Sequence, residues 1–206
     1  GLESRGLGDV YKRQPTTPEL ALAHTDALKD IVLQAGKEIL QVYNTEFAVQ
    51  TKRDESPLTQ ADLAAHQVIV AGLQQLTPGI PIISEESELP AFSERSQWQR
   101  YWLVDPLDGT KEFVSRNGEF TVNIALIEDN APALGWVGVP VQGRLFFGNA
   151  LAREAWVEDS TGRRPLRGKA RQPDDEKLTV VASRNHGGQR LEDYLSLIHI
   201  SEPTRL

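Results

Sequence analysis

The chain has 206 residues, of which 39% are hydrophobic and 25% are charged, a composition typical of an ordinary globular domain. No apolar run approaches the roughly 20 residues that a membrane-spanning helix requires, and the net charge of -7 argues against a surface that coats nucleic acid. Because the chain contains no cysteine, it has no disulfides or thiolate metal sites, so any metal ion must be held by oxygen or imidazole ligands.

Two amphipathic helices are predicted in the first half of the chain. Thr17-Pro18-Glu19 is typical of a helix start, and apolar residues then recur at three- and four-residue steps as far as Tyr43. A second helix is predicted from Thr59, ended by Pro78-Gly79. Between the two helices, alternating apolar residues predict a strand over residues 47–51.

Short apolar segments in the second half predict a sheet packed on these helices. Residues 80–84 are typical of a buried strand, and residues 101–104 of a strand that ends by delivering Asp105. The strands that follow have short connections and should pair antiparallel, which gives an α+β layer. These further strands are expected over residues 120–127, 133–139, 144–148 and 155–158.

The remaining segments give weaker signals. Residues 91–100 are polar and lack periodicity, whereas residues 163–176 are expected to form a surface connection before a strand over residues 178–182. His24 and His66 lie on the predicted helices and are expected at their surface. Four tryptophans lie on or beside apolar segments and are expected in the core: Trp98, Trp102, Trp136 and Trp156.

The strongest functional signal is the segment Asp105-Pro106-Leu107-Asp108-Gly109-Thr110. Its two carboxylates can converge only if the chain turns between them, and the proline and glycine favour such a turn. Carboxylates and carbonyls are the ligands that hard divalent cations such as Mg²⁺ prefer, so the aspartates and the leucine carbonyl predict a cation site. The glycine and threonine would then open a helix whose free N–H groups face a phosphate.

Ordinary structural explanations exist for each part of this pattern. Asp-Gly is a common turn, and a pair such as Glu85-Glu86 usually lies on a solvated surface. Their joint occurrence after two apolar strands favours a site, because clustered carboxylates repel one another unless a cation or protons intervene. Phosphatases of the haloacid-dehalogenase class are an alternative, but they have one residue between their two acids, whereas this segment has two, and their sheet is parallel.

The same segment, preceded by Ser84-Glu85-Glu86, resembles the signature of the inositol-monophosphatase superfamily. Ser56-Pro57-Leu58-Thr59-Gln60-Ala61-Asp62 resembles the upstream metal-site element of that superfamily. Residues 98–126 look like its CysQ-type 3'(2'),5'-bisphosphate nucleotidases in particular. The resemblance extends from Leu20 to Tyr194 and implies the layered αβαβα sugar-phosphatase fold.

The resemblance also implies a division into domains. Residues 15–160 would form the N-terminal metal-binding α+β domain, and residues 161–195 the start of a truncated C-terminal α/β domain. Methionine is absent, which favours a partial or processed product, and we expect non-native tails over residues 1–14 and 196–206. No tryptophan is followed by aspartate, whereas the superfamily carries such an element later in its chain, so we expect this chain by itself to be inactive.

The metal site implied by the resemblance holds two or three Mg²⁺ ions, and lithium is expected to inhibit by replacing a weakly held ion. Glu86 would support the ligands rather than hold an ion, and Glu85 would also count as catalytic. The implied ligands are Glu85, Asp105, the Leu107 carbonyl, Asp108 and, at a weaker third site, Asp62.

Roles in phosphate chemistry follow from the same resemblance. Thr110, together with Asp62, would orient and activate the attacking water, and the N–H groups of Gly109 and Thr110 would bind the phosphate. Arg184 or His186 would contact the second phosphate or the nucleoside, although a polar loop at a strand end explains both residues equally well.

The activity that this resemblance implies is Mg²⁺-dependent hydrolysis of adenosine 3',5'-bisphosphate to AMP and phosphate, a reaction linked to sulfur assimilation. Direct in-line attack by water, without a phosphoenzyme, is the implied mechanism. The alternatives are an inositol or sugar monophosphatase and, from another class, a catalytically inactive domain that binds divalent ions.

The expected partner is a small phosphorylated nucleotide rather than a nucleic-acid polymer. A cytoplasmic location is expected, and peripheral contact with the inner membrane rests on the family resemblance alone. The sequence leaves the oligomeric state open.

Overall fold

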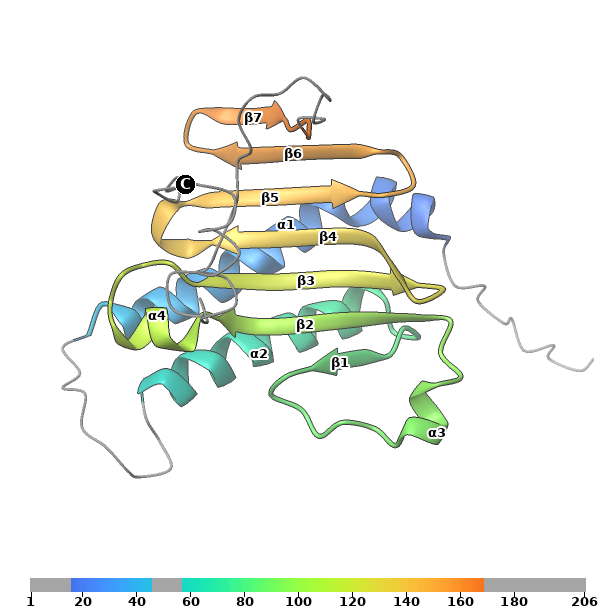
Figure 1. Ribbon diagram of the computed structural model, residues 1–206, viewed down its shortest axis with the longest axis horizontal. Helices are drawn as coiled ribbons and strands as arrows, with labels where there is room; N and C mark the ends of the chain where they lie inside the picture. The colour runs from blue at the N-terminus through green and yellow to red at the C-terminus, as the bar shows by residue number, and fades with distance from the viewer. Residues whose placement is uncertain (1–15, 46–56, 169–206) are drawn as a thin grey trace, which may run out of the picture. The chain divides into compact units, whose positions relative to one another are not determined.

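A computed structural model of the chain describes residues 16–45 and 57–168. The chain divides into two compact units, residues 1–167 and 168–206, and all described residues except Gly168 belong to the first. In this unit two long helices cover one face of a seven-stranded sheet (Figure 1). The predicted α+β layer is therefore confirmed. Among the described residues, no helix is long and apolar enough to cross a membrane.

The two long helices are α1, Thr17–Tyr43, and α2, Pro57–Leu76. The N-cap of α1 is Thr16 rather than the predicted Thr17, and the Thr16 N–H donates to the Glu19 carboxylate at 2.6 Å. The strand predicted over residues 47–51 lies outside the described residues. Residues that recur every three or four positions form the buried faces of the helices: Leu28, Val32, Ala35 and Ile39 in α1, and Ala61, Ala65, Ile69 and Leu73 in α2.

The strands follow one another across the sheet in chain order. β1 pairs parallel with β2, and every later pair of neighbours is antiparallel. The strands are β1 Ile82–Ser84, β2 Arg100–Asp108, β3 Thr121–Glu128, β4 Ala131–Val139, β5 Arg144–Asn149, β6 Glu154–Asp159 and β7 Gly162–Pro165. The short helices are α3 Phe92–Arg95, α4 Thr110–Val114 and the 3-10 turn η1 Pro140–Gln142.

Two of these elements differ from the prediction. The polar segment at residues 91–100 contains the single turn α3, which has no buried residue and therefore no apolar periodicity to reveal it. The predicted surface connection begins instead with β7, whose four residues are all exposed. An exposed edge strand with arginines lacks the alternation of a half-buried strand, so no pattern in these residues predicts it.

Tryptophans form much of the core between the helices and the sheet. Trp102 and Trp136 are fully buried, with ring centroids 6.2 Å apart, and the Trp102 Nε1–H donates to the Thr77 Oγ1 at 2.9 Å. Trp156 is also buried, so the prediction is confirmed for three of the four tryptophans. Trp98 is half-buried beside Tyr101, with ring centroids 6.3 Å apart.

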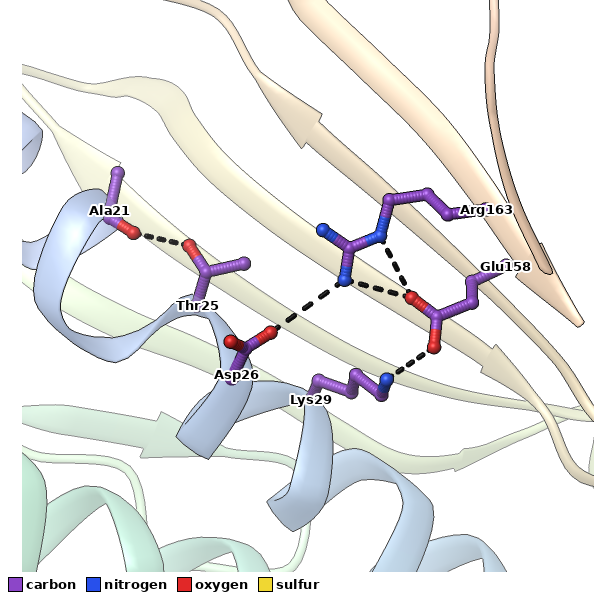
Figure 2. Close-up of polar contacts among 6 residues, drawn as sticks. All are labelled: Ala21, Thr25, Asp26, Lys29, Glu158 and Arg163. Atoms are coloured by element: carbon purple, nitrogen blue, oxygen red, sulfur yellow. Dashed lines mark hydrogen bonds and ion pairs between the residues drawn. The ribbon is translucent and has the colours of Figure 1, made fainter.

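An ion-pair network ties α1 to the strands at the far edge of the sheet (Figure 2). The Glu158 carboxylate on β6 accepts hydrogen bonds from Lys29 on α1 and from Arg163 on β7. Arg163 also lies 3.6 Å from Asp26 and stacks over the Trp156 ring at 3.9 Å. These contacts lower the pKa of Glu158, chiefly through the hydrogen bond from Lys29.

We expect Glu158→Gln to lower the free energy of unfolding at neutral pH by about 1 kcal/mol, because the network is only partly buried. A carboxylate whose folded pKa is lowered stabilises the fold above its unfolded pKa. That stability is lost as the pH falls through the folded pKa. The difference in melting temperature between Glu158→Gln and wild type should therefore shrink in acid. A difference that is independent of both pH and salt would contradict an electrostatic origin.

Candidate active site

The segment 105–110 lies at an irregularity between β2 and β3. Asp105 pairs with Asn123, and the next pair is Asp108 with Thr121, so β2 contains one extra residue. This bulge corrects the prediction that the strand ends at Asp105, because pairing resumes at Asp108. Pro106 lies within the bulge, where its missing N–H breaks no pairing hydrogen bond.

The bulge leads directly into α4. Gly109 has a φ of 107° and a ψ of 49°, a left-handed conformation that favours glycine. A Cβ at this position would lie 3.1 Å from the Phe120 Cα. Phe113 on α4 is buried against Phe120, with ring centroids 5.4 Å apart, so the short helix is anchored to the core. The predicted helix start at Thr110 is confirmed, and the Thr110 side chain is exposed.

β1 brings a second acidic segment next to the first. The parallel register pairs Ser84 with Val104, so that Glu85 follows β1 beside Asp105. The Glu85 N–H donates to the Val104 carbonyl at 3.2 Å, which fixes the backbone of Glu85 against β2. Asp62 on α2 lies near enough to this pair for the charges to interact.

Burial and neighbouring negative charges raise the pKa values of Asp62 and Asp105. Burial, followed by the charges of Glu86, Asp105 and Glu85, raises the pKa of Asp62 from 3.8 to about 7. Burial, the charge of Asp108 and then the charge of Glu85 raise the pKa of Asp105 from 3.8 to about 6. The Leu107 N–H partly offsets this shift, whereas a side-chain hydrogen bond with Glu85 adds to it. These five residues, Asp62, Glu85, Glu86, Asp105 and Asp108, form the carboxylate cluster. Such a cluster holds a proton or a cation more readily than separate carboxylates do.

The donor set fits a hard divalent cation. The Oδ1 atom of Asp105 is buried and has no hydrogen-bond partner among the described residues. Carboxylate oxygens of this kind are the ligands that Mg²⁺ or Ca²⁺ prefers. Within residues 16–45 and 57–168, however, no three histidine, aspartate or glutamate side chains already converge closely enough to hold an ion. The residue types fit the cation, and the side chains would have to close around it.

Sequence reasoning missed two polar contacts near this cluster. His66, predicted at the helix surface, is half-buried, and its Nδ1 lies 2.8 Å from the Oγ of the buried Ser84. Its position four residues after Asp62, on the same side of α2, was the available signal. Asn123 donates from Nδ2 to the Asp108 Oδ2 at 3.1 Å. The signal for Asn123 was that it is the single amide in the largely apolar strand β3.

The other predicted site residues are distributed as follows. Glu86 is half-buried and acts on Asp62 through its charge. The Leu107 side chain is only 2% exposed, so the backbone between the two aspartates is anchored in the core. Arg184 and His186, predicted to contact the substrate, lie outside the described residues.

The metal-free protein should become more stable as the pH falls from about 8 to about 5. Between these limits folded Asp62 and Asp105, with pKa values of about 7 and about 6, take up protons that the unfolded chain does not. Thermal unfolding with a chelator tests this, and added Mg²⁺ should remove the trend by neutralising the same charges. A melting temperature that rises with pH over this range without divalent ions would contradict the placement of the cluster.

A helix-backed, largely antiparallel sheet with clustered carboxylates at a bulge before a short helix fits one known family. The chain belongs to the inositol monophosphatase family, whose model matches residues 23–201.

Individual relatives agree with this family. The 3'(2'),5'-bisphosphate nucleotidase CysQ of Salmonella typhimurium (strain LT2) is 47% identical over 176 residues, which cover 84% of this chain and 68% of the relative. CysQ of Escherichia coli (strain K12) is 44% identical over 183 residues, or 88% and 72% of the two chains. The crystal structure of CysQ from Bacteroides thetaiotaomicron is similar with a TM-score of 0.63 at 35% identity, covering 84% and 67%. These matches confirm the predicted family and fold class.

Proposed function

We propose that this protein is a Mg²⁺-dependent phosphomonoesterase that hydrolyses the 3'-phosphate of adenosine 3',5'-bisphosphate, releasing AMP and phosphate. The carboxylate cluster carries the proposal, above all the buried and unpartnered Oδ1 of Asp105 among the described residues. The choice of a nucleotide substrate is supported by relatives named 3'(2'),5'-bisphosphate nucleotidases, which are similar over more than four fifths of the chain.

The proposed metal ligands come from two neighbouring strands and α2. Two or three Mg²⁺ ions would neutralise the phosphate and activate a water molecule. The side chains of Asp105 and Glu85 lie side by side because β1 and β2 are parallel. Asp62 would serve a weaker third site, where lithium could compete. The full set of proposed ligands is Glu85, Asp105, the Leu107 carbonyl, Asp108 and Asp62.

The remaining groups of the site would act on the phosphate and the water. The N–H groups of Gly109 and Thr110 lie where the chain enters α4, and we assign them to the phosphate oxygens. The Thr110 hydroxyl, with Asp62, would orient the water for in-line attack. Asp62, on α2, lies beside the other carboxylates, and we assign it to accept the proton of that water. In the metal-free protein the charge of Glu86 helps to raise the pKa of Asp62.

The test is turnover by the full-length protein. Phosphate release from adenosine 3',5'-bisphosphate should require Mg²⁺ and should greatly exceed release from inositol monophosphate. A clear preference for inositol monophosphate would contradict the nucleotidase proposal and favour the alternative function, an inositol or sugar monophosphatase. Mg²⁺ binding without release from either substrate would favour a catalytically inactive ion-binding domain. Location in the cytoplasm and a place in sulfur assimilation stay predictions.

A further inference from the structure

Asn123 is the one side-chain amide in β3, Thr121–Glu128. The buried residues Val122, Ile124 and Leu126 alternate with it, so the Asn123 side chain lies on the face of the sheet away from the helices. Asp105 is its direct partner in the register with β2. Cross-strand partners share one face, which places the amide beside the carboxylate cluster.

The amide reaches across the bulge to the other aspartate of the segment. Its Nδ2 donates to the Asp108 Oδ2 at 3.1 Å, whereas its own register partner is Asp105. Asp108 is exposed, so packing does not hold its carboxylate in one rotamer. Asn123 therefore fixes the direction of Asp108 relative to Asp105. The strand that carries it is held in the core by its buried side chains on the opposite face.

An amide is chemically suited to this task. It donates a hydrogen bond to one carboxylate oxygen and leaves the other, Oδ1, free for an ion. Unlike lysine or arginine, it carries no positive charge that would compete with the cation for the carboxylates. A merely structural contact between the strands would contribute about 1 kcal/mol to folding and nothing specific to ion binding.

We propose that Asn123 is a positioning residue that holds Asp108 in the orientation needed to bind the divalent cation. This inference rests on the proposed metal-dependent function and adds a residue to it. Loss of a group that orients a metal ligand typically weakens metal binding by about 10- to 100-fold.

Asn123→Leu and Asn123→Ala test this role in the full-length protein, since both remove the donor and Leu keeps a similar size. We expect the Mg²⁺ concentration for half-saturation, measured by calorimetry and by the Mg²⁺-induced rise in melting temperature, to increase about 10-fold or more. The melting temperature without Mg²⁺ should change little, and kcat should fall more than KM rises. Asn149→Leu is the matched control, because the Asn149 side chain accepts a hydrogen bond from the Ala152 N–H at 3.0 Å in the β5–β6 turn, away from the carboxylates.

Wild-type Mg²⁺ affinity in folded Asn123→Leu and Asn123→Ala would overturn the positioning role while leaving the proposed function intact. An equal loss of affinity in Asn149→Leu would also overturn it, since the effect would not be specific to Asp108. If both Asn123 variants fail to fold without Mg²⁺, the contact is structural and the proposal is wrong. If wild type itself binds no Mg²⁺ and releases no phosphate, the proposed function fails first.

Discussion

Asp105→Asn should abolish Mg²⁺-dependent phosphate release while making the metal-free protein more stable. The substitution removes a carboxylate ligand whose Oδ1 is buried and has no partner among the described residues. An ion in such a site supplies several kcal/mol to the transition state, which corresponds to a rate loss on the order of 100- to 1000-fold. The same substitution removes a negative charge that the charges of Asp108 and Glu85 repel, so the metal-free fold should gain stability.

The stability effect has a defined pH dependence. Because the folded pKa of Asp105 is raised to about 6, its ionised form destabilises the metal-free fold above that pH. The gain in melting temperature from Asp105→Asn should therefore be largest at about pH 8. It should shrink as the pH falls below about 6 and be smallest near the ordinary pKa of 3.8, where the unfolded residue is protonated as well. Added Mg²⁺ should stabilise wild type more than the variant.

Asp129→Asn provides the matched control for this pair of effects. Asp129 is exposed in the turn between β3 and β4 and has a φ of 50°, a conformation that asparagine adopts readily. Its substitution removes the same charge without touching the cluster, so turnover and Mg²⁺ affinity should be unchanged. Near-native turnover by Asp105→Asn would refute both the metal assignment and the mechanism.

Prediction from sequence worked where the chain is periodic or the chemistry is local. The three- and four-residue recurrence of apolar residues in α1 correctly predicted a helix with one buried face, on which Leu28, Val32 and Ala35 lie. The apolar segment at residues 120–127 likewise predicted β3, in which Val122 and Ile124 are buried. The segment at residues 105–110 indicated a divalent-cation site through its residue types alone, without knowledge of the strand pairing.

Features that depend on pairing between distant segments could not be predicted. The bulge at Pro106 is visible only when Asp105 and Asp108 are matched to β3, so the sequence alone placed the strand end three residues too early. The contact of His66 with Ser84 joins a helix to a strand 18 residues later. The spacing of His66 from Asp62 indicates a side of α2, but not the strand that this side contacts. Edge strand β7 has no buried face, so its residues show no apolar pattern. It is a strand because it pairs with β6, and that pairing appears only in the folded structure.

Gly109→Ala should cost about 3 kcal/mol of folding free energy and most of the activity. Two separate penalties combine at this position. An alanine at a φ of 107° is strained, and its Cβ would lie 3.1 Å from the Phe120 Cα, a backbone atom of the residue that precedes β3. Relief of that contact would move the start of α4, and with it the N–H groups assigned to the phosphate, so turnover should fall as well.

Gly143→Ala separates the two penalties. Gly143 is also left-handed, with a φ of 59°, but none of the described residues lies within 4 Å of a Cβ at this position. We expect it to cost only about 1 kcal/mol, from backbone strain alone, and to leave turnover at the wild-type level. Denaturant unfolding and phosphate release measured for both variants test the difference. If Gly109→Ala is no more destabilising than Gly143→Ala and retains activity, then close packing of the Asp108–Thr110 turn against Phe120 is not what holds the phosphate-binding backbone in place.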